Sequence, residues 1–413
     1  MGVLLSALLL ASMPALSSRA ATPHVTTSAV PATVGTAGKA APSCAASGAT
    51  FNDPRGNEEA QQRIIRMTES CIDGSPPGSV IRIATLDITF DYITDGLIAA
   101  HHRGVRVKVV LPSTQADEPD GSRLARSLGT DVSQGSFVRF CYNACHLTGV
   151  MHAKFSLFSK SGGASQVAMS TSSNLTPWSA HNNWNDAYTT AGNARVYAAY
   201  VRYFRSLLGP RRTFRRTYSI GDYRLWFYPT PVGTRRNQLY NILLSNIRCP
   251  RRRPTVVRVS TSLWSTTMAR AARRLVALQR YGCVVRVSLQ SDHTDPLIVE
   301  ILRRGHVRSR FSDVDEDGRP GGSTNSHSKF ITINGRYLRS DVRSVTTGTL
   351  NMTRPGSRTS DNNMIWIGGQ RVHAAYVAAF DDVWEQSVGI GSASGRQATR
   401  TRPMTTREQL AAD

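Results

Sequence analysis

Two short segments decide how this chain is organised: Met151-His152-Ala153-Lys154-Phe155 and Ser326-His327-Ser328-Lys329-Phe330, which begin 175 residues apart. β-type residues surround the pattern His-x-Lys in both, so a strand is predicted for each segment. Side chains alternate between the two faces of a strand, which places the His and the Lys of each copy on one face. The chain has only five lysines, and two of them stand in these copies. A compact ammonium group is therefore favoured beside each imidazole.

The residues around these segments repeat at almost the same offset. Two β-type runs, Val80–Ala84 and Val256–Ser260, are each followed by a helical stretch and a second apolar strand. The other recurring features are the second strands at 105–111 and 284–289, the polar segments at 171–176 and 348–353, the Asn-containing segments at 183–186 and 361–363, and the closing helices at 195–208 and 372–384. The chain is therefore an internal duplication.

The order of the elements predicts the fold class. Strands alternate with helices in both copies, so we expect an α/β fold with two homologous lobes, largely buried sheets and a functional site between the lobes. The first lobe is predicted at residues 44–215 and the second at residues 216–390. A length of 413 residues suits two domains of about 100–200 residues each.

Both ends of the chain are predicted to lie outside the lobes. Residues 1–21 carry an apolar run and then Ser18-Arg19-Ala20, a cleavage pattern that predicts a signal peptide and a secreted protein. Residues 22–43, rich in Ala, Thr, Ser and Pro, are expected to form a flexible linker. Residues 391–413 are expected to form a disordered tail.

The six cysteines favour three disulfides in an exported chain, with fifteen pairings open and buried free thiols as the alternative. Sequence neighbourhood suggests the pairs Cys44–Cys71, Cys141–Cys145 and Cys249–Cys283. No Cys or His spacing is typical of structural zinc.

The charge of the chain indicates its partners. A formal net charge of +22 favours polyanions, either a phospholipid or membrane surface or a nucleic acid. With 40% hydrophobic residues, the chain is not an extended disordered one.

The paired His-x-Lys segments suit the chemistry of a phosphodiester. Brought together across a pseudo-twofold axis, one neutral His can attack phosphorus to form a phosphohistidine, and the other, protonated, can give its proton to the leaving alcohol. Lys and Asn side chains would hold the non-bridging oxygens and offset the charge of the transition state. This chemistry requires no metal and no cofactor.

These motifs resemble the phospholipase D superfamily, whose repeated pattern is His-x-Lys-x4-Asp followed by Gly-Ser-x-Asn. The resemblance covers roughly residues 51–388. It implies two α-β-α sandwich lobes, an active site between them and a metal-independent phosphohistidine mechanism, with His152 as nucleophile and His327 as acid and base. The matching residues are His152, Lys154 and Asn174 in the first copy, His327, Lys329 and Asn351 in the second, and Ser172 and Thr349 at the Ser positions.

The chain departs from the family pattern at several positions. Ser159 and Asn334 stand where the family has Asp. The family also places an acidic residue after Gly-Ser-x-Asn to fix a catalytic His. The residues expected in that supporting role here are Asp186 and Asn363, so the two imidazoles are expected to be unequal.

An acidic run before the second His-x-Lys resembles half of a calcium loop. Asp313, Asp315 and Asp317 alternate as oxygen ligands would, and a Gly follows. The twelfth position is Thr324 instead of Glu, so a solvated acidic loop is the favoured interpretation and calcium the weaker one.

The sequence leaves three function hypotheses. The first is a secreted, monomeric phospholipase D-type phosphodiesterase that hydrolyses phospholipid headgroups. The second is a secreted non-specific nuclease of the same superfamily, for which a charge of +22 is equally suitable. The third is a catalytically weak protein that binds anionic surfaces.

Overall fold

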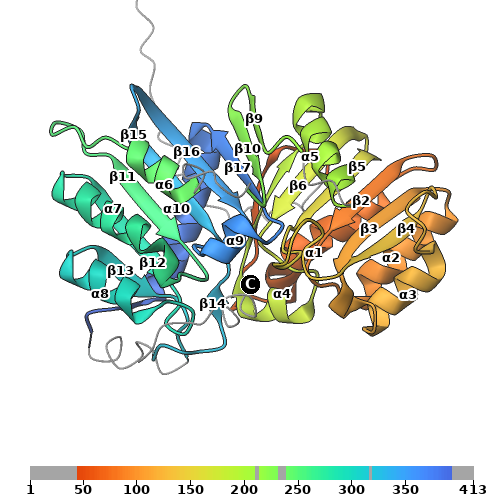
Figure 1. Cartoon of the computed structure of the whole chain (residues 1–413), viewed down its shortest axis with the longest axis horizontal. Coiled ribbons are helices and arrows are strands. Elements are labelled where there is room, and N and C mark those ends of the chain that lie inside the picture. Colours follow the sequence, from red (N-terminus) through yellow and green to blue (C-terminus); the bar gives the residue numbers. More distant parts are fainter. Residues whose placement is uncertain (1–43, 210–213, 231–238, 316–318, 393–413) are drawn as a thin grey trace, which may run out of the picture. The chain divides into compact units, whose positions relative to one another are not determined.

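Two large sheets carry the two copies of the repeat (Figure 1). The computed structural model describes residues 44–209, 214–230, 239–315 and 319–392, and all of them belong to one compact unit, Ala41–Asp413. The predicted signal peptide and linker lie outside the described residues, as do residues 393–413 of the predicted tail.

The first sheet has seven strands in the order β1-β8-β6-β5-β2-β3-β4. Its strands are β1 (Gly48–Phe51), β2 (Val80–Ala84), β3 (Arg106–Pro112), β4 (Phe137–Cys141), β5 (Phe155–Ser161), β6 (Ala164–Thr171) and β8 (Asp186–Thr190). The helices of this lobe are α1 (Glu58–Asp73), α2 (Asp91–His102), α3 (Pro119–Leu128), α4 (Pro177–Asn182) and α5 (Ala194–Ser206), with a short 3-10 turn at Ser113–Gln115.

The second sheet has nine strands in the order β18-β13-β12-β11-β15-β16-β17-β10-β9. They are β9 (Thr217–Ile220), β10 (Tyr223–Phe227), β11 (Val256–Ser260), β12 (Val284–Leu289), β13 (Arg308–Phe311), β15 (Phe330–Tyr337), β16 (Ser340–Gly348), β17 (Asn363–Gly368) and β18 (Val388–Gly389). The helices are α6 (Leu239–Asn246), α7 (Ala269–Arg280), α8 (Pro296–Arg304), α9 (Arg354–Arg358) and α10 (Gln370–Glu385), with a 3-10 turn at Thr266–Met268.

Each of the seven strands of the first sheet has an equivalent in the second, which adds β9 and β18 at its edges, and this confirms the predicted duplication. β2, β3 and β4 are parallel and β5 joins β2 antiparallel, just as β11, β12 and β13 are parallel and β15 joins β11 antiparallel. β1 and β10 close the series at equivalent positions, beside β8 and β17. The predicted α/β fold with two homologous lobes is thus confirmed.

The two lobes are held together by packing and by backbone pairing. One buried cluster combines Phe155 and Tyr203 of the first lobe with Phe227 and Ile365 of the second. Helix α5 packs on β5 and β6 and also contacts β9, while α10 packs on β15–β17 and also contacts β1. A small parallel sheet of β7 (Asn183–Trp184) and β14 (Asn325–Ser326) joins the lobes directly.

The three predicted disulfides are present: Cys44–Cys71, Cys141–Cys145 and Cys249–Cys283. The first fixes the segment before β1 to α1, and the second closes a short loop after β4. In the part of the chain that the structure describes, every helix is too short or too polar to span a bilayer.

Candidate active site

Each His-x-Lys segment lies immediately before a strand, not within it as predicted. β5 begins at Phe155 and β15 at Phe330, one residue after each Lys. The backbone before these strands pairs with the other lobe instead of its own sheet, because the His152 N–H donates to the Asp361 carbonyl and the His327 N–H to the Trp184 carbonyl, each at 3.0 Å. The two segments are therefore placed by contacts between lobes.

Each imidazole is held by an asparagine of the opposite lobe. His152 Nδ1 lies 2.8 Å from Asn362 Oδ1, and His327 Nδ1 lies 3.1 Å from Asn185 Oδ1. Since an amide oxygen only accepts, Nδ1 carries the proton, and Nε2 is left as the lone-pair nitrogen of the neutral ring.

Both asparagine amides are fixed in this orientation by their own neighbours. Asn362 Nδ2 donates to the Gly356 carbonyl and Asn185 Nδ2 to the Ser179 carbonyl, both at 2.9 Å. The predicted supporting hydroxyls complete the arrangement: Ser172 Oγ donates to Asn185 Oδ1 at 2.9 Å, and Thr349 Oγ1 donates to Asn362 Oδ1 at 2.8 Å. The two imidazoles are thus held by equivalent sets of bonds, with Ser172 in one half and Thr349 in the other.

The two lysines are buried next to their histidines. Lys154 and Lys329 are each 1% exposed. Lys154 Nζ donates to the His152 carbonyl at 3.1 Å, and Lys329 Nζ to the His327 carbonyl at 2.7 Å. Two ammonium groups within a buried site create a strong attraction for an anion.

The candidate residues Asn174 and Asn351 occupy equivalent turns that end in capped helices. Thr176 caps α4 by accepting from Ser179 N, and Thr353 caps α9 by accepting from Gly356 N. A Pro at the start of each helix favours this geometry. Asn351 is buried and Asn174 is partly buried.

The surroundings of His327 lower the pKa of its imidazole. Burial lowers its pKa well below the usual range, and the nearby charges of Lys329 and Lys154 lower the pKa further. His152 acts on the pKa of His327 in the same direction. At neutral pH, the His327 ring is therefore neutral in the protein alone.

The imidazoles contact Asn185 and Asn362 and not the predicted Asp186 and Asn363. Asn363 still contacts the first His-x-Lys segment, because its Oδ1 accepts from the Lys154 N–H at 3.1 Å. Asp186 Oδ2 accepts from the Tyr376 hydroxyl at 2.8 Å and from Thr347, and burial raises the pKa of the Asp186 carboxyl. Asn363 Nδ2 donates to Ser170 Oγ at 2.8 Å. The strand alternation turns these side chains away from the imidazoles, so the residues just before them, Asn185 and Asn362, take that position.

Sequence reasoning missed a buried pair that supports one side only. His146 Nδ1 lies 2.5 Å from Asp361 Oδ1, and the Cys145 N–H donates to Asp361 Oδ2 at 2.6 Å. His146 Nε2 lies 3.1 Å from Ser206 Oγ. In the other copy the equivalent of Asp361 is Trp184. This difference between the repeats is the sequence signal that could have pointed to a special role for Asp361.

The residues that replace the family Asp serve the sheets. Ser159 Oγ accepts from the Val80 N–H at 2.8 Å, which ties β5 to the start of β2. Asn334 lies in β15 opposite Val256 of β11. Both positions are several residues along the strand from the His-x-Lys segments.

The candidate calcium ligands are engaged by the chain itself. The Asp313 carboxylate accepts from Ser291 N at 2.8 Å and from Ser291 Oγ at 2.5 Å, and Asp315 Oδ1 accepts from Arg319 N at 2.6 Å. Asp317 lies outside the described residues. Among the residues that the structure describes, no group of three or more His, Cys, Asp or Glu side chains is arranged to hold a metal ion.

The buried Asp313 carboxyl predicts how the unfolding free energy of the protein depends on pH. Burial raises its pKa to about 6, above the usual 3.8, so the folded protein binds more protons than the unfolded chain between about pH 4 and 6. The stabilisation that comes from the Asp313 proton is full below that pH window and is lost as the pH rises through it. Relative to Asp313→Asn, the wild type should lose about 2–3 kcal/mol of unfolding free energy from pH 4 to 7, measured by urea denaturation. A difference in unfolding free energy between the wild type and Asp313→Asn that stays constant across this pH range would contradict the prediction.

The comparisons with known proteins agree with this architecture. A family model described as "Cardiolipin synthase, PLD-like domain" matches residues 75–208 and 255–384, once in each lobe. No curated protein sequence matches the chain.

Two solved structures share the fold at low sequence identity. The phosphatidylserine synthase of Haemophilus influenzae Rd KW20 is 11% identical with a TM-score of 0.55, over 80% of this chain and 86% of that one. A polyphosphate kinase from Porphyromonas gingivalis is 16% identical with a TM-score of 0.53, over 83% of this chain. The chain spans half the length of that kinase.

The repeated family match covers more than half of the chain, and each copy of the domain contains one of the two His-x-Lys segments. The protein therefore belongs to the phospholipase D superfamily, whose members act on phosphodiester bonds.

Proposed function

We propose that the protein is a secreted phospholipase D-type phosphodiesterase that hydrolyses phospholipid headgroups through a phosphohistidine intermediate without a metal. The observation that carries the proposal is the pair of imidazoles, each with Nδ1 held by an asparagine of the opposite lobe. With Nδ1 engaged, Nε2 would be the reactive nitrogen of each ring. The ammonium groups of Lys154 and Lys329, which donate to the His152 and His327 carbonyls, would supply the positive charge.

In the proposed first step, His152 Nε2 attacks phosphorus and the bond from phosphorus to the leaving oxygen breaks. Protonated His327 gives its proton to that oxygen, and the headgroup leaves as an alcohol. In the second step, neutral His327 takes a proton from water, the water oxygen attacks phosphorus, and the bond to His152 breaks. Lys154 and Lys329, together with Asn174 and Asn351, would hold the non-bridging oxygens.

The lowered pKa of His327 fits this scheme when an anion is bound. A phosphodiester between Lys154 and Lys329 offsets the two charges that lower the pKa of His327. Binding of the substrate is therefore expected to bring a proton to His327.

The pH dependence of kcat/KM tests the role of His327. In the free protein, only the form below the lowered pKa carries the donor proton, so kcat/KM should fall as the pH rises, with a midpoint below the usual 6.5. A short-chain phosphatidylcholine is a suitable substrate. The fall should be weaker with bis(p-nitrophenyl) phosphate, because nitrophenolate leaves without a proton. An equal fall for both substrates would contradict an acid role for His327.

A phospholipid is the favoured substrate because both His-x-Lys copies lie in one chain, but the net charge of +22 also supports a nuclease.

Secretion is part of the proposal. The three disulfides support it, since such bonds persist in oxidising compartments.

The deciding experiment compares the two substrates directly. The purified protein and its His152→Ala variant are incubated in EDTA with phosphatidylcholine vesicles and, separately, with plasmid DNA. Choline release that the variant lacks supports the phospholipase. DNA nicking that the variant lacks, without choline release, moves the assignment to a nuclease. If neither choline release nor DNA nicking is detected and both proteins still bind vesicles, the result supports a non-catalytic binder of anionic surfaces.

A further inference from the structure

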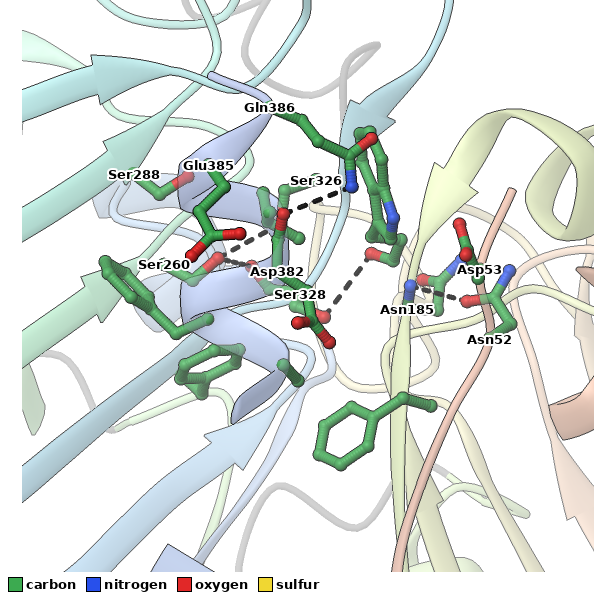
Figure 2. Close-up of a pocket in the computed structure, with 16 residues that line it drawn as sticks. Asn52, Asp53, Asn185, Ser260, Ser288, Ser326, Ser328, Asp382, Glu385 and Gln386 are labelled. Atoms are coloured by element: carbon green, nitrogen blue, oxygen red, sulfur yellow. Dashed lines mark hydrogen bonds between the residues drawn. The ribbon is translucent and has the colours of Figure 1, made fainter. Parts of the chain in front are cut away.

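A cavity lies next to the second His-x-Lys segment, where residues before and at the start of β15 meet residues of β1, β7 and α10. It has a volume of about 240 Å³ and is lined in part by Ser326, Ser328 and Phe330, the residues that alternate with the two candidate catalytic side chains (Figure 2). Neither His-x-Lys segment contributes its His or Lys to the wall. We call it the serine cavity, after Ser260, Ser288, Ser326 and Ser328.

Aromatic rings form the apolar part of the serine cavity. Phe51 comes from β1, Trp184 from β7, Phe330 from β15 and Phe380 from α10. The faces of such rings attract both alkyl groups and cations. One contact already shows this attraction, because the Arg55 guanidinium lies 5.2 Å from the centre of the Trp184 ring.

Hydroxyl groups form the polar part. Ser260 Oγ lies 3.1 Å from Ser326 Oγ, and Ser328 Oγ donates to the Trp184 carbonyl at 3.3 Å. Ser288 is different: it is 1% exposed, and its hydroxyl has no hydrogen-bond partner among the described residues. Figure 2 shows this oxygen turned toward the side of the cavity where Glu385 lies. Buried hydroxyls are normally paired, so Ser288 offers a hydrogen bond to a ligand.

Carboxylates stand at the rim. Asp53 of the first lobe and Asp382 and Glu385 of α10 all border the cavity, and all three residues are exposed. This group of acids is unusual in a chain with a net charge of +22. Arg55 also reaches the rim, where it donates to Gln386 Oε1 at 2.8 Å and to the Val314 carbonyl at 3.2 Å. The carboxylates outnumber it and disfavour an anionic ligand.

From this combination we infer that the serine cavity binds a small organic ammonium ion, either a primary amine or a quaternary ammonium of the size of choline. The aromatic rings would contact its alkyl groups, the carboxylates would balance its charge, and the serine hydroxyls would accept or donate hydrogen bonds. The cavity shares Asn185, which holds His327, with the candidate active site, but neither His and neither Lys of the two segments lines it. Binding of an ammonium ion there can therefore be measured whether or not the proposed catalytic activity is present.

Calorimetric titration of the full chain tests this directly, with choline chloride and ethanolamine hydrochloride as probes at constant ionic strength. Saturable binding of at least one probe is expected. The neutral isostere of choline, with carbon in place of nitrogen, should bind at least about fivefold more weakly, since it lacks the charge that the rings and carboxylates attract. Equal binding of choline and its isostere would overturn the inference, and so would the absence of saturable binding by folded protein.

Three variants locate the binding. Glu385→Gln should weaken it about threefold to fivefold, the range for one exposed charge pair. Ser288→Ala should weaken it as well while the melting temperature stays the same or rises, because no hydrogen bond within the described chain is lost. Glu300→Gln on α8, which does not line the cavity, should bind like the wild type. Binding that Glu385→Gln and Ser288→Ala leave unchanged, or that Glu300→Gln weakens equally, would contradict the site.

Discussion

Replacing His152 with alanine is expected to lower the phosphodiesterase rate by about 10³-fold or more, because the proposed nucleophile is removed while the rest of the site remains. The measurement is the initial rate of alcohol release from whichever substrate the wild type cleaves. His152 is fully buried, so folding of the variant must be checked by circular dichroism.

Two further variants separate chemistry from folding. His152→Asn keeps a side-chain N–H that can donate toward Asn362 Oδ1, so it should be as inactive as His152→Ala but more stable. His102→Ala, at the exposed end of α2, should retain full activity. A His152→Asn protein that is folded and keeps more than about a tenth of the wild-type rate would refute a nucleophilic role for His152.

Removing His146 is expected to have the largest effect on stability. In His146→Ala the buried Asp361 carboxyl loses the imidazole that contacts its Oδ1, and the unfolding free energy should fall by about 3 kcal/mol. The same change should lower activity about tenfold in the folded protein, since Asp361 accepts the backbone N–H of His152 and precedes Asn362. Urea denaturation and initial rates measure the two effects.

A double-mutant cycle assigns this loss to the pair. Asp361→Asn alone and the double variant Asp361→Asn with His146→Ala should show strong coupling, because each side chain contacts the other. The control is His181→Ala, whose pairing with Glu58 at 3.5 Å is partly exposed and should contribute less than about 1 kcal/mol. A cost of His146→Ala no greater than that of His181→Ala would contradict a supporting role for the pair.

The sequence alone determined the duplication and most of the elements. β-type alternation predicted β2, β11 and β12 with their bounds, because these strands are set by local patterns of apolar residues. The three disulfides followed from cysteines at most 34 residues apart in sequence, a separation that the chain closes locally. The two His-x-Lys motifs were visible because the repeat made them equivalent.

Only the tertiary structure decided what holds the histidines. His152 and Asn362 are 210 residues apart, and His327 and Asn185 are 142 residues apart, so no local pattern connects them. The choice of Asn185 over Asp186 depends on which face of a strand end meets the other lobe, and a shift of one residue reverses that face. The pair of Asp361 and His146 and the serine cavity also depend on residues that are distant in sequence, so no local pattern predicts them. They form where the two lobes meet, and the contacts at that junction are fixed by packing between distant segments.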